Sequence, residues 1–170
     1  MTMKPNQPVP GLDVPLVGGG RFRLVDSRPS AFTMVVFYRG YHCPICKTYL
    51  RDLDGRIDEF AALGVEAAAV TSDAADRAVK TVEEWKLSRL RVGYGFGIAG
   101  GRAWGLFVSR AISEKEPPEF IEPGLFLIRP DGRLYASAIQ SMPFARPNFA
   151  DVAAAVRFVK ERGYPARGEA

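Results

Sequence analysis

Apolar residues recur along the chain with two periods, and the switches between these periods predict where strands give way to helices. Residues 32–38 (FTMVVFY) form a continuous apolar run, which is typical of a strand buried on both faces. Beyond a polar segment, apolar residues are spaced three and four apart, as on one face of a helix. They are Leu50, Leu53, Ile57 and Phe60. Pro44 suits the first turn of this helix and Gly64 suits its end.

The same reasoning predicts further elements downstream. Strands are expected at 65–70, 89–92, 125–128 and 134–139. The last two are joined by a strong turn signal at 129–132 (RPDG). We expect one helix capped by Ser72 or Asp73 and another capped by Asn148. Their predicted core faces are Ala75, Val79, Val82 and Trp85 in the first helix, and Phe149, Val152, Val156 and Val159 in the second.

The order of these elements predicts the fold class. Residues 1–20 read as an extended segment with a glycine turn at 18–20, and 21–25 (RFRLV) alternates as an edge strand does. After it come β-α-β-α-β, a hairpin and a final helix, an order that resembles the thioredoxin arrangement. We therefore expect an α/β, thioredoxin-like fold with a central mixed sheet flanked by helices and an N-terminal β-hairpin extension. At 170 residues, the chain is expected to form one domain over 1–170.

Composition narrows the class of function. The chain is 47% hydrophobic and 25% charged, with a formal charge of +4 and no block of Lys and Arg. We interpret the mild basicity as a solubility feature and expect no nucleic-acid partner. No apolar run reaches the ~20 residues that cross a membrane, and the N-terminus lacks the apolar stretch of a secretion signal. We therefore expect a cytoplasmic protein without a membrane partner.

The candidate chemistry lies in the sequence CPIC, Cys43 to Cys46, at the junction of the buried strand and the helix. The first-turn N–H groups and the dipole of a helix stabilise a thiolate placed there and lower its pKa. Arg39, His42, Lys47 and Arg51 add positive or titratable groups nearby. Two intervening residues also allow a disulfide to form on oxidation. A structural zinc site usually needs four protein ligands, and this segment offers only His42 besides the two cysteines.

Three other features have competing interpretations. His42 either tunes the thiols or shuttles a proton, or it is a loop residue that does neither. Residues 95–100 (GFGIAG) fit a nucleotide-binding glycine pattern but lack its expected surroundings, so we interpret them as a flexible turn beside the active site or at an interface. Trp85 and Trp104 are interpreted as packing residues.

The segment FYRGYHCPICKTYL resembles the peroxiredoxin, or alkyl hydroperoxide reductase/thiol-specific antioxidant, family. Phe37 and Tyr38 match the family motif, and Arg39 stands at its proline position. Cys43 stands at the threonine position, and Cys46 at that of the peroxidatic cysteine. The segments VPGLDVPLVGGGRFRL, AAAVTSD and GLFLIRPDGRL are similar to further parts of the family, so the resemblance extends along most of the chain.

Two departures from the family leave the mechanism open. One is Cys43 at the threonine position, and the other is a missing arginine. The arginine expected just before the late hairpin is Pro123, a position where thioredoxins carry a proline, usually in the cis form. In the peroxiredoxin scheme, Cys46 attacks peroxide and Cys43 resolves the sulfenic acid. In the thioredoxin scheme, Cys43 attacks a partner's disulfide and Cys46 resolves. Arg39 is our candidate to replace the missing positive charge.

The resemblance implies a thiol-dependent antioxidant oxidoreductase that reduces peroxides through a Cys43/Cys46 redox pair and uses no cofactor or metal. Its expected reductant is a thioredoxin-, glutaredoxin- or glutathione-type thiol, and we expect a homodimer. One alternative is a thiol–disulfide oxidoreductase that acts on protein disulfides. Others are a synthase-type reductase of endoperoxide lipids and a non-catalytic binding module that holds zinc between two chains. The predicted site is Cys46 and Cys43, supported by Arg39, His42, Tyr38 and Pro123.

Overall fold

The computed structural model describes residues 3–170, so the first two residues of the extended segment predicted at 1–20 lie outside the described residues. Its strands are β1 (Asp13–Pro15), β2 (Arg21–Arg23), β3 (Phe32–Phe37), β4 (Val65–Val70), β5 (Arg91–Gly93), β6 (Val108–Arg110), β7 (Glu119–Ile121), β8 (Gly124–Ile128) and β9 (Leu134–Ile139). Its α-helices are α1 (Pro44–Gly55), α2 (Ile57–Ala62), α3 (Ala75–Trp85), α4 (Ile98–Ala103) and α5 (Phe149–Arg162). No helix of the described residues is long and apolar enough to span a membrane.

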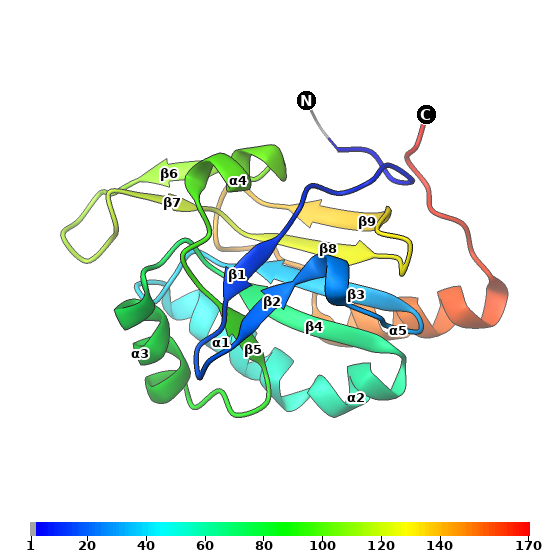
Figure 1. Cartoon of the computed structure of the whole chain (residues 1–170), viewed down its shortest axis with the longest axis horizontal. Coiled ribbons are helices and arrows are strands. Elements are labelled where there is room, and N and C mark those ends of the chain that lie inside the picture. Colours follow the sequence, from blue (N-terminus) through cyan, green and yellow to red (C-terminus); the bar gives the residue numbers. More distant parts are fainter. Residues whose placement is uncertain (1–2) are drawn as a thin grey trace.

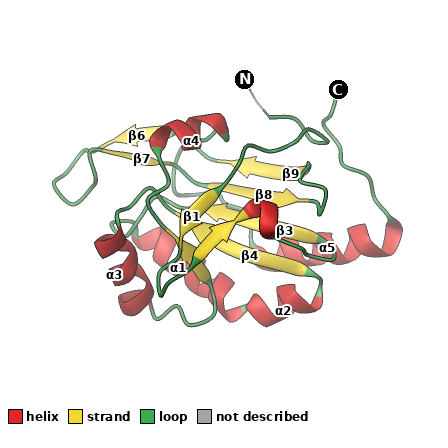
Figure 2. Cartoon of the chain, in the orientation of Figure 1, coloured by secondary structure: helices red, strands yellow, loops and turns green. Residues whose placement is uncertain are grey.

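A mixed five-stranded sheet forms the centre of the fold, in the order β5-β4-β3-β8-β9 (Figures 1 and 2). β3, β4 and β5 run parallel, whereas β8 lies antiparallel to β3 and β9 antiparallel to β8. The N-terminal strands β1 and β2 pair separately as an antiparallel hairpin around the predicted glycine turn. The α/β, thioredoxin-like class and its N-terminal hairpin are therefore confirmed.

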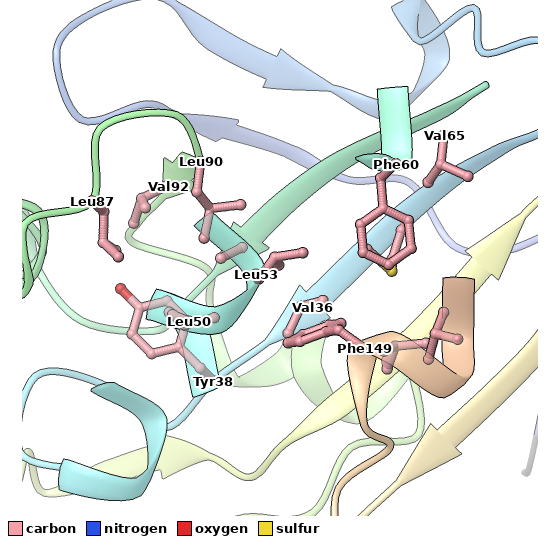
Figure 3. Close-up of a cluster of buried hydrophobic side chains, with 14 of the residues drawn as sticks. Val36, Tyr38, Leu50, Leu53, Phe60, Val65, Leu87, Leu90, Val92 and Phe149 are labelled. Carbon is pink, nitrogen blue, oxygen red and sulfur yellow. The ribbon is translucent and has the colours of Figure 1, made fainter. Parts of the chain in front are cut away.

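The sheet separates two hydrophobic clusters, because successive side chains of β3 point to opposite faces. Met34, Val36 and Tyr38 join the cluster under α1, α2, α3 and α5, which also contains both cysteines. Figure 3 shows this cluster, with Phe60 and Phe149 directed toward Val36 from two different helices. Val35 and Phe37 join the opposite cluster, which the N-terminal hairpin and the α4 region cover. This two-sided burial explains why the β3 sequence is continuously apolar.

Helix α3 differs from its prediction in both its cap and its face. Its N-cap is Ala74, which makes no side-chain cap bond, whereas the Asp73 carboxylate turns inward and is buried. The residues buried on α3 are Ala78, Thr81 and Trp85, and Val79 is exposed. The buried face of α3 is therefore rotated relative to the predicted apolar face. Helix α5 follows its prediction, with the Asn148 side chain accepting the N–H of Ala150.

The glycine-rich segment is also more ordered than predicted. Residues 98–103 form α4, which packs on β7. A Cβ on Gly100 would lie 2.8 Å from the Phe96 ring, and one on Gly101 would lie 2.6 Å from Ile121, so close packing rather than flexibility explains these glycines. The short hairpin of β6 and β7 was not predicted. The break at Arg56, which divides the predicted helix into α1 and α2, was not predicted either.

Candidate active site

The cysteine pair lies where β3 passes into α1, as the sequence predicted. Cys43 is the N-cap residue of α1, and its sulfur accepts the backbone N–H of Cys46 at 3.2 Å. Pro44 occupies the first turn, where its missing N–H costs no helical hydrogen bond. Both cysteines are free and buried. The thiol of Cys43 therefore sits directly at the positive end of a helix.

The two thiols differ in acidity. The pKa of Cys43 is lowered to about 6, first because the Cys46 thiol donates to its sulfur and further because the Cys46 N–H and two arginines favour the charged form. Burial raises the pKa of Cys46 well above its ordinary value, and its hydrogen bond to Cys43 adds to this effect. At neutral pH the pair therefore carries one negative charge, held on Cys43, with the remaining proton on Cys46.

Arg146 is the site residue that sequence reasoning missed. Its Nη2 donates to Cys46 Sγ at 3.4 Å, across a sequence separation of 100 residues. Its guanidinium lies 4.5 Å from the ring centre of Tyr49, and its Nε donates to the carbonyl of Pro143. The Tyr49 hydroxyl in turn donates to the carbonyl of Pro147. These contacts hold the loop between β9 and α5 against α1, so that a cation lies beside the sulfurs.

Arg39 lies near the thiols, but its charge is largely balanced. Its Nε is 3.1 Å from the buried Glu122 carboxylate, and its Nη2 is 3.9 Å from Glu116. Its guanidinium also stacks 4.9 Å from the ring centre of Phe120. Arg39 contributes less than Arg146 to lowering the pKa of Cys43. Arg146 is thus the stronger candidate to replace the arginine charge that the family carries and this chain lacks at Pro123.

His42 is fixed by contacts from two other elements. Its Nδ1 lies 3.3 Å from Nη2 of Arg77 on α3, and its ring meets Phe120 of β7 edge to face with centroids 4.6 Å apart. Burial lowers the pKa of His42, and Arg39 and Arg77 lower it further against the opposing effects of Asp73 and Glu116. His42 is therefore neutral at pH 7 and is held in place by side chains of α3 and β7.

The other two predicted supporting residues lie at the same edge of the sheet. Tyr38 continues β3 and is fully buried in the cysteine cluster, where burial strongly raises its pKa and keeps it a neutral phenol. Pro123 precedes β8, and because Phe37 pairs with Gly124, Pro123 lies close to Tyr38. Pro123 lines a small hollow together with Tyr49 and Arg146. The described residues contain no cis peptide bond, so Pro123 follows a trans bond, unlike the usual proline of thioredoxins.

An open groove adjoins the site between the β6–β7 hairpin and the loop before α5. Arg39, Phe120, Glu116 and Glu122 form one part of its lining. Ser109, Arg110, Ile112, Ser141, Met142 and Pro143 form the rest. The groove thus presents both charged and apolar groups next to Arg39.

The described residues contain no cluster of three or more His, Cys, Asp or Glu side chains arranged to hold a metal ion. The two cysteines therefore supply at most half of a four-ligand zinc site within one chain. The zinc hypothesis would need a second copy of the chain to supply the other ligands.

Comparison with known proteins identifies the family and the fold of this chain. Residues 5–137 match the AhpC/TSA family. The fold is similar to Enterococcus faecalis AhpC, with a TM-score of 0.76 and 18% identity over 98% of this chain and 99% of that chain. It is also similar to peroxidoxin BcpB from Mycobacterium tuberculosis, with a TM-score of 0.73 and 19% identity over 92% of this chain and 98% of that chain. A peroxiredoxin-like protein from Aquifex aeolicus gives a TM-score of 0.75 and 13% identity, over 94% and 89% of the two chains.

A search of curated proteins gives no match. The family match nevertheless spans well over half of the chain, and it includes the helix that carries the cysteine pair. The chain therefore belongs to the AhpC/TSA family and is an enzyme of the thiol peroxidase class.

Proposed function

We propose that this enzyme is an antioxidant peroxidase in which Cys43 and Cys46 cycle between dithiol and disulfide, with the Cys43 thiolate as the attacking group. One observation carries the proposal. Cys43 Sγ caps α1 and accepts the N–H of Cys46, while Cys46 is the buried, protonated thiol beside it. A nucleophile poised as a thiolate and a neutral resolving thiol three residues away are the two groups that the cycle needs.

The proposed cycle has three steps. The Cys43 thiolate attacks the distal oxygen of a hydroperoxide ROOH, the O–O bond breaks, and Cys43 becomes a sulfenic acid while RO⁻ leaves and takes a proton to give ROH. The Cys46 thiol then attacks the Cys43 sulfur, a disulfide forms, and water leaves. Finally, a dithiol donor of the thioredoxin or glutaredoxin type, or two molecules of glutathione, reduces the disulfide and is itself oxidised.

Arg146 supports the proposal because its guanidinium lies beside the sulfurs, where negative charge is present throughout the first step. The family resemblance assigns the first attack to Cys46 instead. The acidity of the two thiols favours Cys43, since burial opposes a thiolate on Cys46. The two assignments lead to the same disulfide and differ in which single-cysteine variant keeps the first step.

The experiment is stopped-flow consumption of hydrogen peroxide by fully reduced protein, with thiols counted at the end. We expect a rate far above that of a free thiol and loss of both thiols per chain. The Cys46→Ser variant should retain the fast first step and accumulate a sulfenic acid that a dimedone probe traps. The Cys43→Ser variant should be slow. If Cys46→Ser is the slow variant and Cys43→Ser the fast one, Cys46 is the attacking residue and our assignment is overturned.

A second candidate function is thiol–disulfide exchange with protein substrates. Pro123 at the sheet edge beside the site, and the low pKa of the first cysteine of a C-x-x-C motif, favour it. Slow reaction with peroxide together with rapid reduction of insulin disulfides would support this function over the peroxidase.

A further inference from the structure

Arg77 links three elements around the cysteine loop, residues 38–43 between β3 and α1, and the cycle proposed above assigns Arg77 no role. Its Nε lies 3.1 Å from Oδ1 of Asp73. Its Nη2 lies 3.3 Å from Nδ1 of His42 and donates to the carbonyl of Lys115 at 3.1 Å. Its guanidinium also faces the ring of Tyr41 at 5.8 Å. Arg77 therefore holds α3, the cysteine loop and the tip of the β6–β7 hairpin in one arrangement.

The anchor of Arg77 is a buried carboxylate. Asp73 is 1% exposed, and its second oxygen accepts the backbone N–H of Tyr41 at 2.7 Å. Gly40 lets the loop pass this close, because a Cβ there would lie 2.5 Å from the carboxylate. A buried carboxylate with both oxygens occupied keeps its partner guanidinium in a fixed orientation.

The orientation of Arg77 determines where the proton of His42 lies. A guanidinium can only donate hydrogen bonds, so the nitrogen that faces Arg77 must be an acceptor without a proton. A neutral imidazole carries its single proton on the other nitrogen. His42 therefore presents Nε2–H, and this atom is buried without a hydrogen-bond partner among residues 3–170. Leaving a buried N–H donor without an acceptor costs free energy, unless a bound ligand supplies the acceptor atom.

We propose that Arg77, anchored by Asp73, is a positioning residue that locks His42 as the Nε2–H tautomer, and that this N–H donates to an oxygen of the bound hydroperoxide. The second half rests on the proposed peroxidase function. In the first step negative charge moves from sulfur onto the departing oxygen, and a hydrogen bond from Nε2–H stabilises that oxygen without transferring its proton. The charged and titratable groups around His42 are Arg77, Asp73, Arg39 and Glu116, and with them packs the ring of Phe120.

Because His42 is the only histidine of the chain, nitrogen-15 labelling of histidine gives a single pair of ring signals. We expect the wild-type protein to show a protonated Nε2 and an unprotonated Nδ1, with no averaging between the two tautomers. Arg77→Met should give a mixture of tautomers. Arg157→Met, which removes an exposed arginine of α5 paired with Glu59, should leave the signals unchanged. A proton on Nδ1 in the wild type, or an unchanged tautomer in folded Arg77→Met, would overturn the proposal.

The donor role is tested by the rate of peroxide consumption in three variants of His42. Glutamine places an amide N–H near the position of Nε2, asparagine does not reach it, and phenylalanine removes it. We expect His42→Phe and His42→Asn to be slower by about tenfold to a hundredfold, and His42→Gln to retain most of the rate. Equal rates for His42→Phe and the wild type would refute the donor role. If the wild type itself fails to react with peroxide, the proposed function fails, while the nitrogen signals still decide whether Arg77 positions His42.

Discussion

At the scale of single residues, the site depends on one shared proton between two thiols. The largest contribution to the low pKa of Cys43 is the hydrogen bond from the Cys46 side chain. Cys46→Ala removes this donor and should raise the pKa of Cys43 from about 6 toward its ordinary value. Cys46→Ser keeps a hydroxyl donor and should leave the pKa low. The ultraviolet absorbance of the thiolate, titrated in both variants, checks this, and equal pKa values in the two variants would contradict it.

The same acidity determines how the reaction depends on pH. The thiolate is the reactive form, so the rate of Cys43 alkylation or oxidation should rise with pH up to about 6 and level off above it. Below this value, the rate should fall about tenfold for each further pH unit, since the thiolate fraction falls by that factor. Rates measured with iodoacetamide across this range provide the check. A rate that still climbs steeply above neutral pH would show that neither thiol is acidic.

Arg146 should lower the pKa of Cys43 more than Arg39 does. Arg146→Met removes the guanidinium beside Cys46 Sγ and should raise the pKa of Cys43 by about one unit, as expected for a nearby opposite charge. Arg39→Met should have a smaller effect, because Glu122 and Glu116 already balance the Arg39 charge. Thiolate titration of both variants is the measurement. A larger shift for Arg39→Met would reverse this ranking.

Which site residues could be predicted from the sequence depends on how far apart they lie along the chain. Cys43 and Cys46 share one motif and one helical turn, so their proximity could be predicted. Arg146 and Arg77 reach the loop from positions 100 and 35 residues away, and no local pattern indicates them. The inward turn of Asp73 was missed because its position after a strand also fits a helix cap.

At the scale of elements, the cysteine loop depends on Gly40. Its φ is +137°, and a Cβ would meet the Asp73 carboxylate. Gly40→Ala should lower the free energy of unfolding by about 2 kcal/mol or more, because backbone strain and a clash add. Gly132→Ala is the matched control, since its φ is +77° and nothing lies near its Cβ. Urea denaturation of the reduced proteins measures both, and equal losses would mean that the close approach to Asp73 costs nothing.

Helix α5 begins directly after the loop that carries Arg146. Asn148 caps it by accepting the N–H of Ala150 at 2.8 Å. Asn148→Ala should cost about 1 kcal/mol of stability, whereas Asn148→Asp should cost little, since aspartate caps equally well. Thermal unfolding of the two variants tests this expectation. An equally large loss for the aspartate variant would argue that packing, rather than capping, fixes the helix start.

Elements were predictable where the apolar pattern was long. The continuous run of β3 and the spaced apolar residues of α1 and α5 correspond to the observed core. The strands β6 and β7 span three residues each, too few to establish a period. In α3, Thr81 is buried although it is polar, so an apolar pattern could not predict its place on the buried face.

At the scale of the whole molecule, the central sheet separates the redox chemistry from the second core. Trp85 packs in the cysteine cluster, with ring centroids 6.1 Å from Tyr38 and 6.4 Å from Tyr41. Trp104 lies in the opposite cluster, against Phe37 and Phe126. A change at the sulfurs therefore reaches Trp85 through residues of the same cluster, such as Tyr38, whereas it reaches Trp104 only across a layer of close-packed strands.

This separation predicts which tryptophan reports oxidation. Forming the Cys43–Cys46 disulfide should change the intrinsic fluorescence of the wild-type protein and of Trp104→Phe by a similar absolute amount. Trp85→Phe should lose most of that change while still forming the disulfide, as counted by free thiols. If Trp85→Phe keeps the full signal, oxidation must rearrange the far side of the sheet. The two hydrophobic clusters would then change together, and the side of the sheet covered by the N-terminal hairpin would respond to the redox state of the cysteines.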